Sequence, residues 1–507
     1  MHRREFLALS AVPWAAAQQR LPNIVFILAD DLGWGDLGCY NPQSKIKTPH
    51  LDRLAAQGIR FTDAHTPSSV CTPTRYGLLT GRYSWRTRLK LGVQDGFDPP
   101  LIEKGRMTVA SMLKQRGYAT GCFGKWHLGM QWTRKDGTPM PLRTSGGFRP
   151  GDDVDFSKRA TDGVNAAGFD EYFGISASLD MPPYCFVEDG RAVGKMSARL
   201  PKGMTLFLNQ TEGMAAEGFR LEDVVPEVTD RAVSFIERNA EQPFFLYLPL
   251  SSPHLPVVPN KEFEGKSGAG KYGDFVVEMD AAVGKILEAL DRADVAGNTL
   301  VCFSSDNGGL WHWWEFVEAD DVQGGKTTPR GAYNKDHGHQ SNAWMRGTKA
   351  DAWEGGHRVA FVARWPGRIK TGTVSDSTIC LTDFFATCAE AVGQKLPADA
   401  GEDSFSLLPV FANAKREVRD HVVHHTLQGK FAIRSGEWKL IVERGSGGFS
   451  VPRTVEVKEG EAAGQLYNLR TDRQETKNVY LEHPEVVARL RAKLEAVRKA
   501  GRSRGPA

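Results

Sequence analysis

The sequence predicts an α/β protein in which helices flank one large mixed, mostly parallel sheet, followed by a smaller C-terminal α+β subdomain. Apolar, β-branched runs of strand length alternate with helical patterns through most of the chain, as in parallel-rich sheets with crossover helices. Near Cys380 the pattern changes to short strand pairs and a terminal amphipathic helix. At 507 residues, the chain can build a large core and a second unit. We therefore expect a main domain over 20–378 and a subdomain over 379–507.

The main domain is predicted to contain several buried strands and helices. The strands are expected at 23–29, 118–123, 244–250 and 299–304. One helix should begin at Pro49 behind the N-cap residue Thr48 and stop near Gly58, because proline suits the first helical turn and glycine the helix end. Apolar spacing predicts a second helix around Met112 and a third that Pro226 opens.

The C-terminal subdomain begins with a predicted helix over 384–392. Residues 431–434 and 438–441 are expected to form short antiparallel strands, since each is a compact apolar run between turn signals. Between these strands and the last helix, the glycine-rich segment 446–450 predicts a surface loop. The last helix should begin at Pro484, because apolar residues then recur at helical spacing.

Composition and the N-terminus bound the protein's location and partners. Residues 1–17 are predicted to be an export signal of twin-arginine type, with Arg3-Arg4 before a short apolar run and three small residues. That run is too short to cross a bilayer, so we expect an exported, periplasmic or extracellular protein of bacterial type without a stable membrane anchor. A net charge of +3 argues against nucleic acid as a partner, because nucleic-acid binders are usually strongly basic.

The chain has seven cysteines and no C-x-x-C pair, so the sequence supports neither a zinc ribbon nor a thioredoxin-like motif. An odd number in an exported protein leaves one cysteine over. Up to three disulfides among the remaining six stay open.

Polar side chains follow each of the predicted strands at the point where the strand ends. They are Asp30, Asp31, Lys125, His127, His254, Asp306 and Asn307. Because the carboxyl ends of parallel strands share one edge of a sheet, we expect these side chains to meet there. Asp30, Asp31, Asp306 and Asn307 offer hard oxygen ligands, which suit Ca²⁺ better than zinc and are also compatible with Mg²⁺. The sequence therefore predicts a divalent-cation site at this edge.

A further motif begins at Cys71 and runs Cys-Thr-Pro-Thr-Arg, followed by Thr80-Gly81-Arg82. Pro73 near the first helical position puts Cys71 at a helix N-terminus, where free backbone N–H groups favour anions. The motif resembles the C-x-P-x-R and T-G-R signature of the type I, formylglycine-dependent sulfatases. In that family the cysteine is oxidised by a formylglycine-generating maturase to an aldehyde whose hydrate attacks sulfur. Conversion of Cys71 would also account for the cysteine left over.

The resemblance implies roles for the residues at the sheet edge, on the alkaline-phosphatase-like fold of that family. Asp30, Asp31, Asp306, Asn307 and the oxidised Cys71 would bind one divalent cation, usually calcium. Arg75, Lys125 and Lys349 would surround the sulfate with the fixed positive charge that its transition state needs. His254 and Lys349 would protonate the departing alcohol, and His127 would take a proton from the aldehyde hydrate.

The resemblance covers nearly the whole mature chain and favours a carbohydrate substrate. Residues 168–175, followed by Ser178 and Asp180, are similar to the family's middle segment near the substrate pocket. The stretch 179–184 resembles bacterial arylsulfatases and enzymes like N-acetylgalactosamine-6-sulfatase, so 6-O-sulfated galactose or N-acetylgalactosamine is the favoured substrate. Ser178, Asp180, Trp311 and His339 are the candidate substrate contacts. Trp311 fits either a sugar-stacking surface or ordinary aromatic packing.

Two other functions stay open at this point. A phosphonate monoester or phosphodiester hydrolase would keep the fold and the oxidised cysteine but act on a different ester. A non-catalytic binder of sulfated glycans would keep Cys71 as a thiol and bind without turnover.

Overall fold

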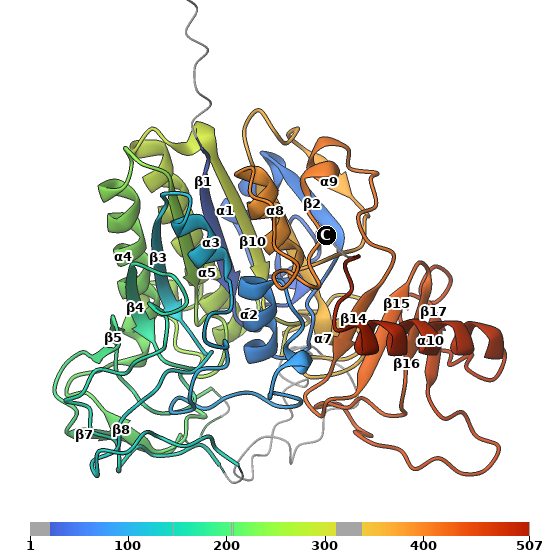
Figure 1. The fold of residues 1–507 in the computed structure, drawn as a ribbon, viewed down its shortest axis with the longest axis horizontal. Helices are drawn as coiled ribbons and strands as arrows, with labels where there is room; N and C mark the ends of the chain where they lie inside the picture. Colours follow the sequence, from blue (N-terminus) through green and yellow to red (C-terminus); the bar gives the residue numbers. More distant parts are fainter. Residues whose placement is uncertain (1–20, 145–146, 204, 206, 311–336, 506–507) are drawn as a thin grey trace, which may run out of the picture.

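The structure is a computed structural model that describes residues 21–144, 147–203, 205, 207–310 and 337–505. A large sheet with helices on both faces forms the main body, and a small sheet with the terminal helix lies beside it (Figure 1). The predicted export signal at 1–17 lies outside the described residues. The predicted fold class is confirmed.

Eleven strands of the described chain build the large sheet. Along the sheet they are β12 (Thr373–Ser375), β2 (Ile59–His65), β11 (Arg358–Arg364), β10 (Thr299–Ser305), β1 (Asn23–Ala29), β9 (Phe244–Pro249), β3 (Ala119–Lys125), β4 (Glu171–Ile175), β5 (Val187–Glu188) and β6 (Arg191–Ala192), with β13 (Ile379–Cys380) paired to β2. Strands β10, β1, β9, β3 and β4 are mutually parallel. β11 is antiparallel to both β10 and β2, so β2 runs in the direction of β10. These six strands therefore end at one edge.

Alternate residues of the central strand β1 face opposite cores, as expected for a strand covered on both sides. Phe26 packs in one core and Ile27 in the other. One face is covered by α1 (Pro49–Ala56), α4 (Val224–Arg238) and α5 (Gly270–Arg292). The other is covered by α2 (Cys71–Thr80), α3 (Val109–Lys114), α8 (Asp383–Ala391) and α9 (Leu408–Ala412).

The small sheet is antiparallel throughout, in the order β14 (Val422–His425), β15 (Phe431–Ser435), β16 (Trp438–Ile441) and β17 (Gln465–Asn468). The helix α10 (Pro484–Ala500) packs its apolar residues against this sheet. A separate hairpin-like pair joins β7 (Ala198–Leu200) to β8 (Gly213–Ala215). The predicted domain boundary at 378/379 stays a prediction. Strand β13 and helix α8, on its C-terminal side, pack with the large sheet.

Most expected elements have the expected place, with small shifts at their ends. α4 begins at Val224, two residues before Pro226, because proline is also tolerated within the first helical turn. Two long strands of the large sheet, β2 and β11, were not predicted. β2 carries charged and polar residues among the apolar ones, and the apolar run of β11 is only five residues long between two arginines, which weakens the signal of a buried strand.

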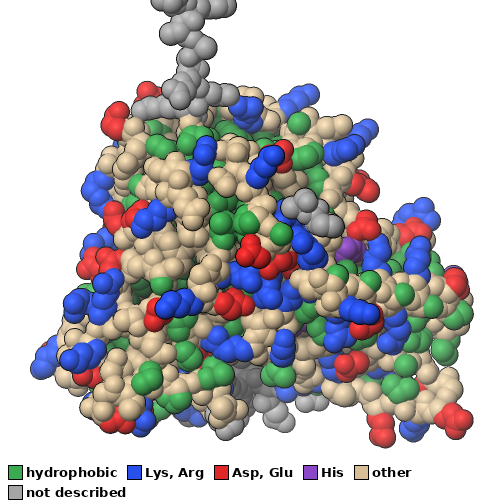
Figure 2. All heavy atoms as spheres, in the orientation of Figure 1, with side chains coloured by type: hydrophobic (Ala, Val, Ile, Leu, Met, Phe, Trp, Pro, Cys, Tyr) green, Lys and Arg blue, Asp and Glu red, His purple; other side chains and the backbone are tan. Residues whose placement is uncertain are grey.

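Three further features concern the surface charge, the cysteines and the helices. Basic and acidic side chains are interspersed over the face seen in Figure 2, in line with the nearly balanced charge. All seven cysteines lie in the described residues as free thiols, so none of the disulfides left open by the sequence is present. In the described part of the chain, no helix combines the length and the apolar character that a membrane crossing requires.

Candidate active site

Cys71 is the first residue of α2 and is almost completely buried, with 3% of its surface exposed. The sequence had placed Pro73 near the first helical position; it is instead the third residue of the helix. Burial raises the pKa of the Cys71 thiol to about 11, although Lys125 and Lys349 pull it down. The unmodified side chain is therefore a neutral thiol and a poor nucleophile at neutral pH.

Arg75 lies one helical turn after Cys71 and is held by the end of β10. Its Nε and Nη2 donate to the same oxygen of Asp306, Oδ2, at 3.0 and 2.7 Å, and its Nη1 donates to the carbonyl of Lys125 at 2.9 Å. Lys125 in turn contacts Asp30 Oδ2 at 2.5 Å. These four side chains have no exposed surface, so each charge depends on its partners for compensation.

A second ion pair joins the end of β1 to the loop that precedes α7 (Glu354–His357). Lys349 Nζ lies 2.7 Å from Asp31 Oδ1 and 2.9 Å from Oδ2. Asn307 also donates to Asp31 Oδ1, at 2.8 Å. Burial opposes ionisation of Asp31, but Lys349 and His254 lower the pKa of its carboxyl to about 2. Asp31 is therefore a fixed anion between the ends of β1 and β10.

The predicted metal ligands still have unused acceptor atoms. Asp30 Oδ1 and Asn307 Oδ1 are buried and have no hydrogen-bond partner among the described residues. Burial raises the pKa of the nearby Asp306 to about 6, with Asp30 adding to the effect. Buried oxygens without donors and a carboxylate that resists ionisation both call for a cation. Asp30, Asp31, Asp306 and Asn307 therefore fit a divalent ion that prefers oxygen ligands.

His127 follows β3 and is fixed in one tautomer. Its Nε2 lies 2.9 Å from the carbonyl oxygen of Gln94, so this nitrogen donates, while the buried Nδ1 has no partner among the described residues. Burial, with Lys125 and Arg75 nearby, lowers the pKa of the ring well below its usual value. The backbone φ of His127 is 56° and that of Asp31 is 65°. Such left-handed conformations cost about 1–3 kcal/mol and persist at sites whose surroundings enforce them.

His254 follows β9 and faces Asp31, with 3.6 Å between its Nε2 and Asp31 Oδ2. Its Nδ1 donates to the carbonyl of Leu255 at 2.5 Å and also lies 3.2 Å from Ser178 Oγ. Ser178 accepts a hydrogen bond from Lys125 at 3.1 Å. Burial and Lys349 lower the pKa of His254 to about 4, against the pull of Asp31. Asp180 also acts on this pKa and has a buried oxygen, Oδ1, with no partner in the described structure.

We call the residues brought together at this edge the catalytic cluster: Asp30, Asp31, Cys71, Arg75, Lys125, His127, His254, Asp306, Asn307 and Lys349. Trp311, a predicted substrate contact, lies outside the described residues. His339 is held in a different network, because its Nε2 lies 2.7 Å from Asp36 and its Nδ1 accepts from the backbone of Lys45. Both ring nitrogens are engaged, so His339 is left out of the substrate contacts proposed below.

Two features of the site were missed by the sequence analysis. Gln94 acts through its backbone carbonyl, which no side-chain pattern could have indicated. The segment 446–450 is not a surface loop, and that prediction was wrong. Its backbone N–H groups at Phe449 and Ser450 donate to the buried carboxylate of Asp351 at 2.8 and 3.0 Å. Gly448 lets the backbone of this segment lie directly against Ala350 and Asp351, in the loop that carries Lys349.

Comparisons with known proteins agree with this geometry. The family model described as Sulfatase matches residues 22–394, and the model described as N-sulphoglucosamine sulphohydrolase, C-terminal, matches 348–500. An N-acetylgalactosamine-6-O-sulfatase of Bacteroides thetaiotaomicron is 34% identical over 94% of this chain and 93% of its own. Human N-acetylgalactosamine-6-sulfatase is 32% identical over 79% of this chain and 68% of its own. A sulfatase structure from the glycosaminoglycan metabolism of B. thetaiotaomicron superimposes with a TM-score of 0.80 at 32% identity, covering 95% of this chain and all of that one.

The fold and the site thus define a hydrolase of sulfuric esters. The chain belongs to the sulfatase family, and its Cys71 motif is that of the type I members. That family generally uses formylglycine and a divalent metal. In the catalytic cluster Cys71 is the residue that can be converted to formylglycine, and the unused oxygens are suited to hold the metal.

Proposed function

We propose that this protein is an exported, calcium-dependent carbohydrate sulfatase that removes 6-O-sulfate from galactose or N-acetylgalactosamine after oxidation of Cys71 to formylglycine. The observation that carries the proposal is the convergence of Cys71, three buried cations and unused carboxylate and amide oxygens at one sheet edge. A structural thiol would not need this surrounding, because buried oxygens left without a donor or a cation cost free energy unless a ligand fills the site.

The absent groups have clear places in the cluster. Asp30, Asp31, Asp306 and Asn307 would hold the calcium ion beside position 71. Formylglycine would supply a hydrated aldehyde as nucleophile, and the ion would supply positive charge next to it. Calcium is favoured over zinc because every side chain of this set offers oxygen.

The cations of the chain bind and orient the sulfate. Arg75 is fixed by Asp306, Lys125 by Asp30 and Ser178, and Lys349 by Asp31. None of these side chains is free to reorganise when charge builds up around sulfur. Such preorganised charge in a dry site stabilises a transition state far more than the same charges would in water.

Two histidines move protons in the reaction, each through one ring nitrogen that the structure leaves available. Leu255 holds the Nδ1 proton of His254, so Nε2 is the nitrogen that exchanges a proton with the departing alcohol oxygen. A bound sulfate would raise the pKa of His254 and favour the protonated form that a general acid needs. Gln94 holds the Nε2 proton of His127, so its unpaired Nδ1 is the general base for a hydroxyl at position 71.

The choice of sugar rests on the relatives and on two side chains near His254. Relatives named for 6-O-sulfated N-acetylgalactosamine match most of this chain. Asp180 has a buried oxygen without a donor, which suits a hydroxyl of the sugar. Ser178 lies between Lys125 and His254, where it can order the ester oxygen.

Maturation and export belong to the same proposal. Residues 1–17 serve as the export signal, 20–378 as the catalytic domain and 379–507 as the C-terminal subdomain. Because Cys71 and all of α2 are buried, a formylglycine-generating maturase must reach the cysteine before the domain closes. The mature enzyme then acts in the periplasm or outside the cell.

The test is sulfate release by protein co-produced with a maturase, measured on 6-O-, 4-O- and 2-O-sulfated sugars and on a phosphonate monoester. We expect release from 6-O-sulfated N-acetylgalactosamine or galactose, and none by the Cys71→Ala variant with an unchanged circular dichroism spectrum. Release only from the 4-O- or 2-O-sulfated sugars would contradict the proposed position of the sulfate ester. Hydrolysis of the phosphonate alone, with formylglycine verified at position 71, would contradict the proposed activity.

A further inference from the structure

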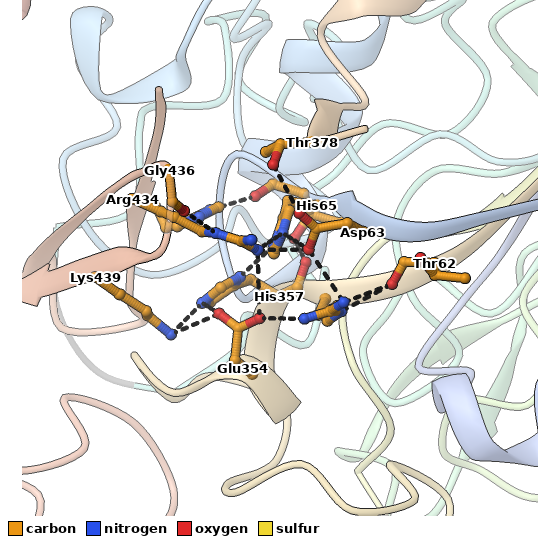
Figure 3. A network of polar contacts seen from close by, with 12 residues as sticks. Thr62, Asp63, His65, Glu354, His357, Thr378, Arg434, Gly436 and Lys439 are labelled. Atoms are coloured by element: carbon orange, nitrogen blue, oxygen red, sulfur yellow. Dashed lines mark hydrogen bonds and ion pairs between the residues drawn. The ribbon is translucent and has the colours of Figure 1, made fainter. Parts of the chain in front are cut away.

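A second buried polar cluster lies where the small sheet meets the large one, and the catalytic cluster does not use it. We call it the interface cluster (Figure 3). Its charged members are Asp63, Glu354, Arg358, Arg434, Lys439 and Glu475, and three histidines, His65, His357 and His424, lie among them. They come from β2, from α7 and β11, from β14 to β16, and from the segment before α10.

Lys439, on β16, is the centre of this cluster and has no exposed side-chain surface. Its Nζ lies 3.0 Å from Glu354 Oε1, 2.8 Å from Glu475 Oε1 and 2.9 Å from His357 Nε2. Because the ammonium can only donate, His357 accepts at Nε2 and carries its proton on Nδ1. That Nδ1 lies 3.1 Å from His65 Nδ1, and the opposite nitrogen of His65, Nε2, lies 3.0 Å from Asp63 Oδ1 and 3.1 Å from Arg434 Nη1.

The three histidines bring ligand atoms within 4.8 Å of one another, yet their geometry opposes a metal ion. The rings of His357 and His424 stack with centroids 3.7 Å apart and planes 14° apart. A ring nitrogen binds a metal in its own ring plane, and one ion cannot lie in two nearly parallel planes. Three acids are also already balanced by three permanent cations. The cluster is therefore held together by ion pairs and hydrogen bonds, and His424 Nε2 is a buried ring nitrogen in it without a hydrogen-bond partner among the described residues.

The interface cluster holds the segments on both sides of the active site. On one side, Glu354 N donates to Glu475 Oε2 at 2.7 Å, and Arg346 donates to the Glu475 carbonyl at 2.7 Å. These contacts fix both ends of the loop that carries Lys349. On the other side, His424 donates to the carbonyl of Thr66 at 2.8 Å, in the segment that leads to Cys71.

From this connectivity we propose that Lys439 is a positioning residue for catalysis: through Glu354 and Glu475 it holds Lys349 at Asp31. The proposal rests on the catalytic role proposed for Lys349. It also gives the small sheet a function in the reaction, since a lysine from its second-last strand fixes a loop of the catalytic cluster. Catalytic groups usually need such outer partners to hold their geometry.

The test compares variants in the maturase-treated full-length enzyme. Lys439→Met removes the cation at similar volume. The double variant Lys439→Met/Glu475→Gln also removes one anion, which limits the cost of unpaired buried charge if the single variant folds poorly. The matched control is Arg419→Met, which breaks another fully buried ion pair, to Asp383, beside the small sheet but away from the Lys349 loop. Turnover, midpoint of thermal unfolding, and hydrogen exchange of the peptide 346–357 are measured for each.

We expect kcat to fall at least tenfold in both Lys439 variants and the 346–357 amides to exchange faster. Arg419→Met should lower the unfolding midpoint but keep kcat within about twofold and leave that peptide protected. Unchanged exchange, or faster exchange with unchanged kcat, would overturn the proposal, as would stoichiometric metal bound at the histidines. If the wild-type enzyme releases no sulfate, the proposed function fails; unchanged exchange of 346–357 would then still overturn the positioning by Lys439, and faster exchange would support it.

Discussion

The catalytic cluster and the interface cluster are built from the same kinds of residues and differ in how their side-chain oxygens are paired. Both are buried, and both combine carboxylates, permanent cations and neutral histidines. In the interface cluster every carboxylate oxygen of Asp63, Glu354 and Glu475 faces a cation or a donor, and the buried atom left without any partner in the described structure is a neutral ring nitrogen, His424 Nε2. In the catalytic cluster Asp30 and Asn307 each keep an oxygen without a partner among the described residues. Buried charge by itself marks structure, whereas buried carboxylate and amide oxygens that face neither a donor nor a cation mark a place for a cation.

The largest effect that separates the two clusters should come from Asp31→Asn. This change removes the anion that Lys349, Asn307 and a calcium ion share, and a metal contributes several kcal/mol to such a transition state. We expect sulfate release below detection and no rise of the unfolding midpoint with added calcium, which stabilises only a protein that binds it. Asp63→Asn, in the interface cluster, should lower the midpoint yet keep the calcium-dependent rise. A calcium response in the Asp31 variant equal to wild type would remove Asp31 from the metal site.

An intermediate effect is expected from His127→Gln, because a positioned base typically contributes about 10²–10⁴-fold to a rate. The unpaired Nδ1 of His127 would be lost, so kcat should fall by about that factor while calcium binding persists. The matched change is His424→Asn in the interface cluster, whose amide can keep the hydrogen bond to the Thr66 carbonyl. It should change kcat only a few-fold. Equal losses of kcat in the two variants would contradict the separate roles of the clusters.

The smallest effect concerns the pH dependence of stability through Glu475. Burial raises the pKa of this carboxyl to about 7, helped by Glu354 and opposed by Lys439. Its folded pKa exceeds the unfolded value of about 4.5, so protonation stabilises the folded state at low pH, and this stability is lost as pH rises through 7. Glu475→Gln cannot lose a proton. The unfolding midpoint of the variant, relative to wild type, should therefore rise from pH 5 to pH 8; a constant difference would show that Glu475 titrates normally.

The sequence predicted that polar residues meet at this edge because several of them follow closely on a mainly apolar strand. Asp30 after β1 and Asp306 after β10 are examples. Parallel strands carry all such residues to one edge, so the order of strands in the sheet did not have to be known. The Cys71 motif added a local signature that needed no tertiary information.

The interface cluster could not be predicted in the same way. His65 and Glu354 look like ordinary strand-end and helix-start residues, and Lys439 is the one charged residue of a four-residue strand. Only the antiparallel β11, inserted between β10 and β2, brings them together. The burial of the segment 446–450 has a similar origin, because Asp351 attracts its backbone N–H groups. A glycine-rich stretch does not reveal such a partner.

The most direct test of the account is to measure sulfate release and the chemical state of residue 71 in the same samples. Protein produced with graded amounts of maturase would give a series of preparations with different fractions of formylglycine, determined by mass spectrometry of the peptide that contains Cys71. We predict that release from 6-O-sulfated N-acetylgalactosamine is proportional to the converted fraction and extrapolates to zero. Full activity in a preparation whose Cys71 is entirely thiol would contradict the account.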